Sequence, residues 1–225
     1  MERKKEMMHS SSHSNARSSI FASIRENLAK SEPFNEEHQE AKSEPRTGVL
    51  FVETNTSEVF RESLEMVGAK CTFVENEIEA ADRLRSIVGD RSATEIIVSD
   101  SELVHRIVNA AGINAIQDAS RDELFSSAIG ITSAQWAIAE TGTLVLESGA
   151  ERHRLASLVP PVHVCIVTTS SIRQSMAEIL KLMDPDANRA ITFVTGASRT
   201  SDIELTLAIG VHGPGELYVV VIKDQ

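Results

Sequence analysis

The residues with the clearest chemical potential follow a short strand near the end of the chain. The stretch 191–194 predicts a strand, and a loop of small residues that carries Arg199 comes directly after it. Ser201, followed three residues later by Glu204, has the pattern of a capping box, which predicts a helix over 201–209. The N–H groups and dipole of a helix N-terminus favour an anion, and a guanidinium beside them adds a charged donor. The segment therefore predicts a small-anion site, although an ordinary capped crossover helix gives the same pattern without a ligand.

A second candidate is the run Glu140-Thr141-Gly142-Thr143. It forms the turn from a short predicted helix, AQWAIAE, which Ser133 can cap, to a predicted strand, TLVLES. Gly142 is expected to supply a left-handed C-cap conformation. Glu140 could reach a cleft beside strand ends, where open α/β sheets bind ligands, and act there as a base or nucleophile. The alternative is a surface carboxylate near a helix end, with the glycine present for geometry alone.

Other candidates are isolated in the sequence. Trp136 suits core packing or the wall of a ligand pocket, and the Arg-His-Arg run at 152–154 suits a solvated loop or an anion site. His163 and His212 stand alone, and lone histidines are more often structural than ligands. No Ser-His-Asp elbow, Walker loop, GxGxxG or HExxH motif occurs.

The elements that must position these residues alternate along the chain from Thr47 onward. Continuous short apolar strands separated by amphipathic helices predict a parallel sheet covered on both faces. In the second half, strands follow one another with fewer helices between them, which allows antiparallel pairs. The predicted helices are 57–67, 77–88, 101–111, 171–183 and 201–209, and the predicted strands are GVLFVE, CTFVE, EIIVS, INAI, AIGIT, TLVLES, HVCIVTT, ITFVTG and LYVVVI.

The first part of the chain has a different composition. Residues 1–46 form a polar tail with one amphipathic helix at about 17–30, and residues 47–225 form the folded domain. The helix carries an apolar stripe that it cannot bury by itself. We expect it to dock on the main domain or on another subunit. The stripe consists of Ile20, Phe21, Ile24 and Leu28.

Composition excludes several classes of function. The formal net charge of −11 argues against nucleic acid as the main partner. No apolar run has the length of a membrane span and no signal-peptide pattern occurs, so a cytoplasmic location is expected. Cys71 and Cys165 are isolated in predicted strands, which favours packing, and two cysteines cannot complete an iron–sulfur cluster or a Cys-type zinc site.

Three segments together resemble the LUD domain of lactate-utilisation proteins, of the LutC (YkgG) type. They are GITSAQWAIAETGTLVLES, LVPPVHVCIV and SRTSDIELTLAIGVHGPGELYVVVI, and the resemblance extends over about 47–222. The family loop usually written GPSRT stands here as GASRT, with Ala197 in place of proline. The resemblance implies a NagB/RpiA/CoA-transferase-like α/β fold, which is a Rossmann-like three-layer sheet with helices on both faces.

The resemblance also implies a pathway. It implies an accessory subunit that works beside iron–sulfur partner subunits in the oxidation of L-lactate to pyruvate, with no cofactor or metal in this chain. A stand-alone enzyme of the isomerase or acyl-transferase type, with Glu140 as base or nucleophile, and a pure partner-binding module remain alternatives. With Glu140 as the catalytic candidate, the expected ligand-binding residues are Thr141, Gly142, Thr143, Ser198, Arg199, Thr200, Asp202, Glu204 and His212.

Overall fold

The chain divides into two compact units, Met1–Phe51 and Val52–Gln225. In the first unit, helix α1 spans Arg3–Lys30, so it begins well before the predicted 17–30. Its apolar stripe, Ile20 to Leu28, is exposed. No helix in the described part of the chain is both long and apolar enough to cross a membrane. The computed structural model describes residues 3–30, 55–91, 93, 95–148, 154–184, 190–200, 208–209 and 212–224.

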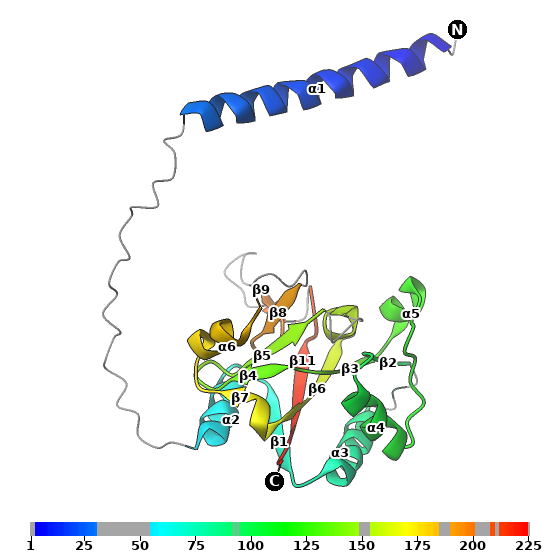
Figure 1. Cartoon of the computed structure of the whole chain (residues 1–225). Helices are drawn as coiled ribbons and strands as arrows, with labels where there is room; N and C mark the ends of the chain where they lie inside the picture. Colours follow the sequence, from blue (N-terminus) through cyan, green and yellow to red (C-terminus); the bar gives the residue numbers. More distant parts are fainter. Residues whose placement is uncertain are drawn as a thin grey trace. The chain divides into compact units, whose positions relative to one another are not determined.

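The centre of the second unit is a five-stranded sheet in the order β1-β11-β6-β3-β2 (Figure 1). Every neighbouring pair in it is parallel, which confirms the predicted parallel sheet. The apolar runs follow from burial of both faces: along β6, Val164 and Ile166 face one core cluster, while Cys165 and Val167 face another. The strands are β1 (Lys70–Val74), β11 (Glu216–Ile222), β6 (Val162–Thr168), β3 (Ile129–Ser133) and β2 (Ile96–Val98).

Helices cover one face of this sheet, and a helix together with a second sheet covers the other. Helices α3 (Glu77–Asp90) and α4 (Glu102–Ala110) lie beside the first face (Figure 1), where they bury their apolar stripes. Helix α2 (Thr56–Met66) packs Phe60 and Leu64 into the cluster on the second face. A short helix that the sequence pattern did not predict, α5 (Arg121–Ser126), begins with a capping box.

The second sheet has four strands in the order β7-β4-β5-β8. Strand β5 pairs antiparallel with both β4 and β8, which confirms the expected antiparallel pairs, and β4 pairs parallel with β7. The short helix α6 (Met176–Leu182) packs beside it. The strands are β7 (Ile172–Arg173), β4 (Trp136–Ile138), β5 (Thr143–Glu147) and β8 (Ile191–Val194).

Two predicted helices are wrong in part or in full because remote pairing overrides local propensity. The AQWAIAE segment is strand β4, whose Ala137 and Ile138 pair with β5 and β7. The helix predicted over 171–183 begins only at Met176, because the preceding residues form a 3₁₀ turn (Thr169–Ser171) and β7.

Three further predictions have mixed outcomes. Ala208–Ile209, the end of the helix predicted over 201–209, is strand β10, paired antiparallel with β9 (Arg199–Thr200), while 201–207 lie outside the described residues. The INAI segment makes only an isolated bridge, between Ile116 and Ile97. The strand predicted for GVLFVE lies outside the described residues.

Candidate functional site

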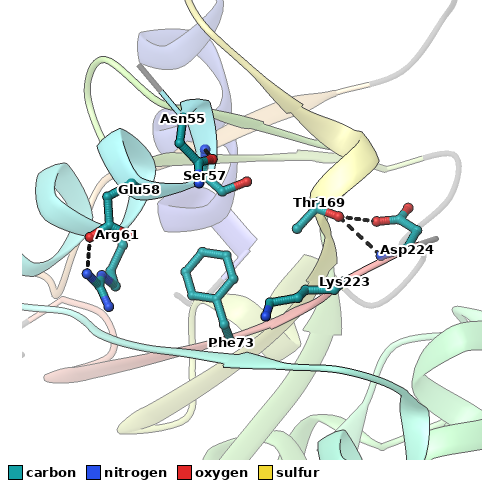
Figure 2. Close-up of a pocket in the computed structure, with 8 residues that line it drawn as sticks. All are labelled: Asn55, Ser57, Glu58, Arg61, Phe73, Thr169, Lys223 and Asp224. Carbon is teal, nitrogen blue, oxygen red and sulfur yellow. Dashed lines mark hydrogen bonds and ion pairs between the residues drawn. The ribbon is translucent and has the colours of Figure 1, made fainter. Parts of the chain in front are cut away.

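A cavity of about 490 Å³ opens at the carboxyl ends of three neighbouring parallel strands, β1, β11 and β6. Helix α2 begins at its opposite side (Figure 2). Ligands of open α/β sheets bind at this edge, because the loops that leave adjacent strands meet there. We call this cavity the strand-end pocket. It is lined by Asn55, Ser57, Glu58, Arg61, Phe73, Thr169, Lys223 and Asp224.

Lys223 supplies a cation to the strand-end pocket. It follows β11 directly, and its backbone N–H donates to the carbonyl oxygen of Val74 at 2.9 Å, which fixes the start of its side chain. In Figure 2 the side chain points toward Phe73. Its Nζ lies 2.5 Å from Glu75 Oε1, and both side chains are about half exposed. An ion pair so open to water contributes little stability, so an incoming anion can replace the glutamate at small cost.

Asp224 has a structural task at the edge of the pocket. Its carboxylate accepts hydrogen bonds from the hydroxyl group of Thr169, from the hydroxyl group of Ser170, and from the Ser170 N–H at 3.0 Å. Burial by itself would raise the pKa of Asp224, but these hydrogen bonds outweigh it and lower the pKa to about 2. The ionised carboxylate therefore ties the end of β11 to the turn after β6.

The start of α2 forms the opposite wall. Asn55 is the N-cap, and its side-chain oxygen accepts from Ser57 N at 3.2 Å. Glu58 and Arg61 form an ion pair one turn apart, with side chains 45% and 42% exposed. The second cation of the pocket is therefore also accessible to a ligand.

Phe73 is the aromatic residue of the pocket. It lies in β1, packs partly against the core cluster that contains Leu64 and Val219, and remains partly exposed. Figure 2 shows its ring between Lys223 and Arg61. The pocket thus combines one flat apolar surface with cations on two sides. This arrangement can bind and orient an organic anion.

Glu140 is not part of this pocket. It is exposed, in the turn between β4 and β5, and its Oε1 accepts from Met176 N at 3.0 Å. It thereby caps the first turn of α6, which fits the interpretation as a surface carboxylate near a helix end. The helix it caps follows it in sequence instead of preceding it.

The other predicted residues of this turn belong to a chain of hydroxyl groups. The Thr141 and Thr143 hydroxyl oxygens lie 2.7 Å apart, and Thr143 lies 2.7 Å from the hydroxyl oxygen of Thr195. The structure therefore brings the two sequence motifs together through Thr195, a residue the sequence interpretation missed. Gly142 has the expected left-handed backbone, with φ of +62°, in a turn between strands and not at a helix C-cap.

Both motifs meet the C-terminal end of α2. A Cβ on Gly142 would lie 2.5 Å from the backbone N of Leu64, and a Cβ on Gly196 would lie 2.6 Å from the carbonyl oxygen of Val67. The Arg199 guanidinium donates to that same carbonyl at 2.5 Å. These motifs hold one end of the helix whose other end lines the strand-end pocket.

None of the remaining predicted residues that the structure describes lines the strand-end pocket, but Ser198 contacts the loop that carries His212, since a Cβ on Gly213 would lie 3.1 Å from Ser198 Cβ. Ser198 donates its N–H to Pro214 O at 2.8 Å, and His212 is exposed. Thr200 ends β9, and Asp202 and Glu204 lie outside the described residues, as do Arg152 and His153. Among the described residues no three His, Cys, Asp or Glu side chains are grouped to hold a metal ion.

Two other side chains have packing roles. Trp136 packs beside the cluster of Ile138, Val145 and Ile179. His163 is fully buried in β6, and its Nε2 lies 2.8 Å from the Thr132 hydroxyl oxygen. Burial lowers the pKa of His163 to about 4, so the ring is neutral at physiological pH.

Burial makes the thiol groups of both cysteines unreactive. Cys165 is fully buried, and burial, helped by the charge of Glu65, raises the pKa of the Cys71 thiol to about 12. Neither is an activated nucleophile.

The sequence interpretation missed the residues of the strand-end pocket. A signal for them is present: polar residues stand directly after two apolar strands, Thr169 after 162–168 and Lys223-Asp224 after 216–222. The carboxyl ends of parallel strands share one edge of a sheet, so residues at these positions meet.

Comparison with known proteins finds one matching family and several similar proteins. The family model of the LUD domain matches residues 57–222. An uncharacterized protein of Neisseria meningitidis serogroup B is 33% identical over 182 residues, which cover 79% of this chain and 72% of that protein. The lactate utilization protein C of Anoxybacillus flavithermus is 28% identical over 180 residues, covering 73% of this chain and 82% of that protein.

A solved structure has the same fold. The crystal structure of a DUF162 family protein from Deinococcus radiodurans superimposes with a TM-score of 0.60 at 24% identity, covering 76% of this chain and 98% of that one. Several other proteins named lactate utilization protein C align over only about half of their own length, from 43% to 55%.

Proposed function

The chain belongs to the LUD domain family, and from this membership we propose that it is an accessory subunit of an iron–sulfur system that oxidises L-lactate to pyruvate. The observation that carries the proposal is the similarity to the lactate utilization protein C of Anoxybacillus flavithermus over 82% of that protein. Electron transfer from lactate needs redox centres, and a cluster needs about four cysteine ligands. This sequence has two cysteines, so we assign the clusters to partner subunits.

We further propose that the subunit has a small-anion site and that this site is the strand-end pocket. The pocket has Lys223 directed into it, and Arg61 stands on its other side. The loop of Arg199 is the weaker candidate, because its guanidinium already donates to Val67 O and so supports α2.

The position of Glu140 favours an accessory subunit over a stand-alone enzyme. A general base must be within reach of the proton it removes, and this carboxylate is engaged at the N-terminus of α6. Gln keeps the side-chain oxygen that accepts from Met176 N but cannot act as a base. Glu140→Gln therefore separates the two functions.

The proposal is tested by deleting the gene in its native host and measuring growth. We expect loss of growth on L-lactate, unchanged growth on pyruvate, and full rescue by both the wild-type chain and Glu140→Gln. Affinity purification of the rescuing chain from cells grown on L-lactate should recover iron-containing partner proteins. Unchanged growth of the deletion strain on L-lactate would refute the role in lactate oxidation. Rescue by wild type but not by folded Glu140→Gln would favour the stand-alone enzyme.

A further inference from the structure

We propose that the strand-end pocket binds a planar aromatic molecule that carries a phosphate or carboxylate group. This inference rests on the proposed anion site and names the class of ligand for it. A pocket of about 490 Å³ is within the range that encloses a drug-sized ligand, whereas lactate or pyruvate would fill only a small part of it.

The aromatic part of the ligand is inferred from Phe73. Its ring lines the cavity and remains partly exposed, whereas Val74, on the opposite face of the strand, is buried in the core. A partly exposed aromatic ring beside cations offers a flat surface on which a planar group can stack. The hydroxyl of Ser57 and the amide of Asn55 lie across the cavity from Thr169, so polar groups surround the apolar surface (Figure 2).

The anionic part is inferred from Lys223. Its partner Glu75 is 62% exposed and is not a lining residue of the pocket, so the ammonium group can exchange this carboxylate for a ligand anion. Both acids on the lining already have partners: Asp224 accepts from the Thr169 and Ser170 hydroxyls, and Glu58 is paired with Arg61. With the ring of the ligand on Phe73, the anion lies at Lys223.

Isothermal titration of the full chain with five compounds tests the proposal. Adenosine monophosphate and nicotinate combine an aromatic ring with a phosphate or a carboxylate, respectively. Adenosine has the ring without the anion, and inorganic phosphate and pyruvate have the anion without the ring. We expect binding of at least one of the first two compounds, at least 10-fold tighter than adenosine, phosphate or pyruvate. Binding of adenosine monophosphate alone indicates a phosphate, binding of nicotinate alone indicates a carboxylate, and binding of both supports the common class of aromatic anions.

Two pairs of variants connect binding to the pocket. Lys223→Ala should weaken binding of the ring-bearing anion by about 10- to 100-fold, the loss of one charge-assisted hydrogen bond, while substitution of the exposed Lys181 in α6, Lys181→Ala, should not. Phe73→Leu keeps an apolar side chain against the core but removes the ring, and should weaken binding by about 5- to 100-fold. Phe193→Leu, a partly exposed phenylalanine in β8, is its control.

The possible results separate three proposals: the ligand class, the anion site and the role in lactate oxidation. Binding of phosphate or pyruvate as tight as that of the aromatic anions overturns the aromatic ligand class but leaves the anion site intact. Binding of none of the five compounds, or binding that Lys223→Ala leaves unchanged, overturns the site itself. The growth test on L-lactate is independent of these titrations, so its failure refutes the role in lactate oxidation while the ligand class still stands.

Discussion

Replacing Gly142 by alanine tests whether the two sequence motifs hold α2 in place. Gly142 has φ of +62°, and a Cβ at this position would lie 2.5 Å from the N and 2.6 Å from the Cα of Leu64. Both are backbone atoms of α2, so no flexible side chain can move aside. We expect Gly142→Ala to destabilise the domain because the new methyl group must displace the helix or the turn.

The magnitude has two parts. Alanine in a left-handed conformation costs about 1–2 kcal/mol. Overpacking against a fixed backbone adds about 1–3 kcal/mol, giving about 2–5 kcal/mol in total. Gly112 provides the matched control, because its φ is +65° and a methyl group added there would have no atom within 4 Å. Gly112→Ala should therefore cost only the first part.

The free energy of unfolding is measured by urea denaturation of wild type and both variants, with equal slopes required for the comparison. Gly142→Ala should be less stable than Gly112→Ala by about 1–3 kcal/mol. Because α2 lines the strand-end pocket, Gly142→Ala should also weaken binding of the aromatic anion, while Gly112→Ala should not. Equal destabilisation by the two substitutions would refute the close packing of the Gly142 turn against α2.

Three further predictions concern titratable groups. The pKa of Asp224 is lowered to about 2, so its ionised carboxylate stabilises the fold at pH values above its ordinary pKa of 3.8, and this effect is lost as the pH falls toward 2. The midpoint of urea unfolding should therefore change less between pH 5 and pH 2.5 in Asp224→Asn than in wild type. His163 is buried and neutral with a pKa of about 4, so the unfolded state binds the extra proton between about pH 6.5 and pH 4. Stability should therefore fall with decreasing pH in that window by up to about 1.4 kcal/mol per pH unit, and a fold-competent His163→Gln should lack this slope. Cys71, with its pKa raised to about 12, should react with iodoacetamide at pH 8 far more slowly than a free cysteine, and reaction at the rate of the free amino acid would contradict its burial.

Much of the central sheet and its helices could be predicted from the sequence. A strand such as β6 is apolar on both faces because both faces are covered, and its nearly continuous run of apolar residues indicates this burial. Helices α2 and α3 carry a 3.6-residue apolar period, and each is preceded by an asparagine N-cap, Asn55 and Asn76 respectively. The motifs that identify the family are likewise short, contiguous segments of the sequence.

The second sheet could not be predicted with the same certainty. The alanine-rich segment that forms β4 has a local preference for helix, yet its backbone groups pair with β5 and with the remote strand β7. The residues of a strand do not by themselves predict which other strands it will pair with. Those pairings depend on the packing of the whole domain.

The sequence by itself therefore determined the fold class, the family and the parallel sheet, because burial and periodicity act over a few neighbouring residues. Only the tertiary structure decided that Glu140 caps α6, that Gly142 and Arg199 meet the end of α2, and that Lys223, Phe73 and Arg61 line one cavity. These contacts join segments far apart in the chain. The cavity forms because the parallel strands β1, β6 and β11 end at one edge of the sheet. The contacts of Glu140, Gly142 and Arg199 form because the packing of the domain places their segments against α6 and α2.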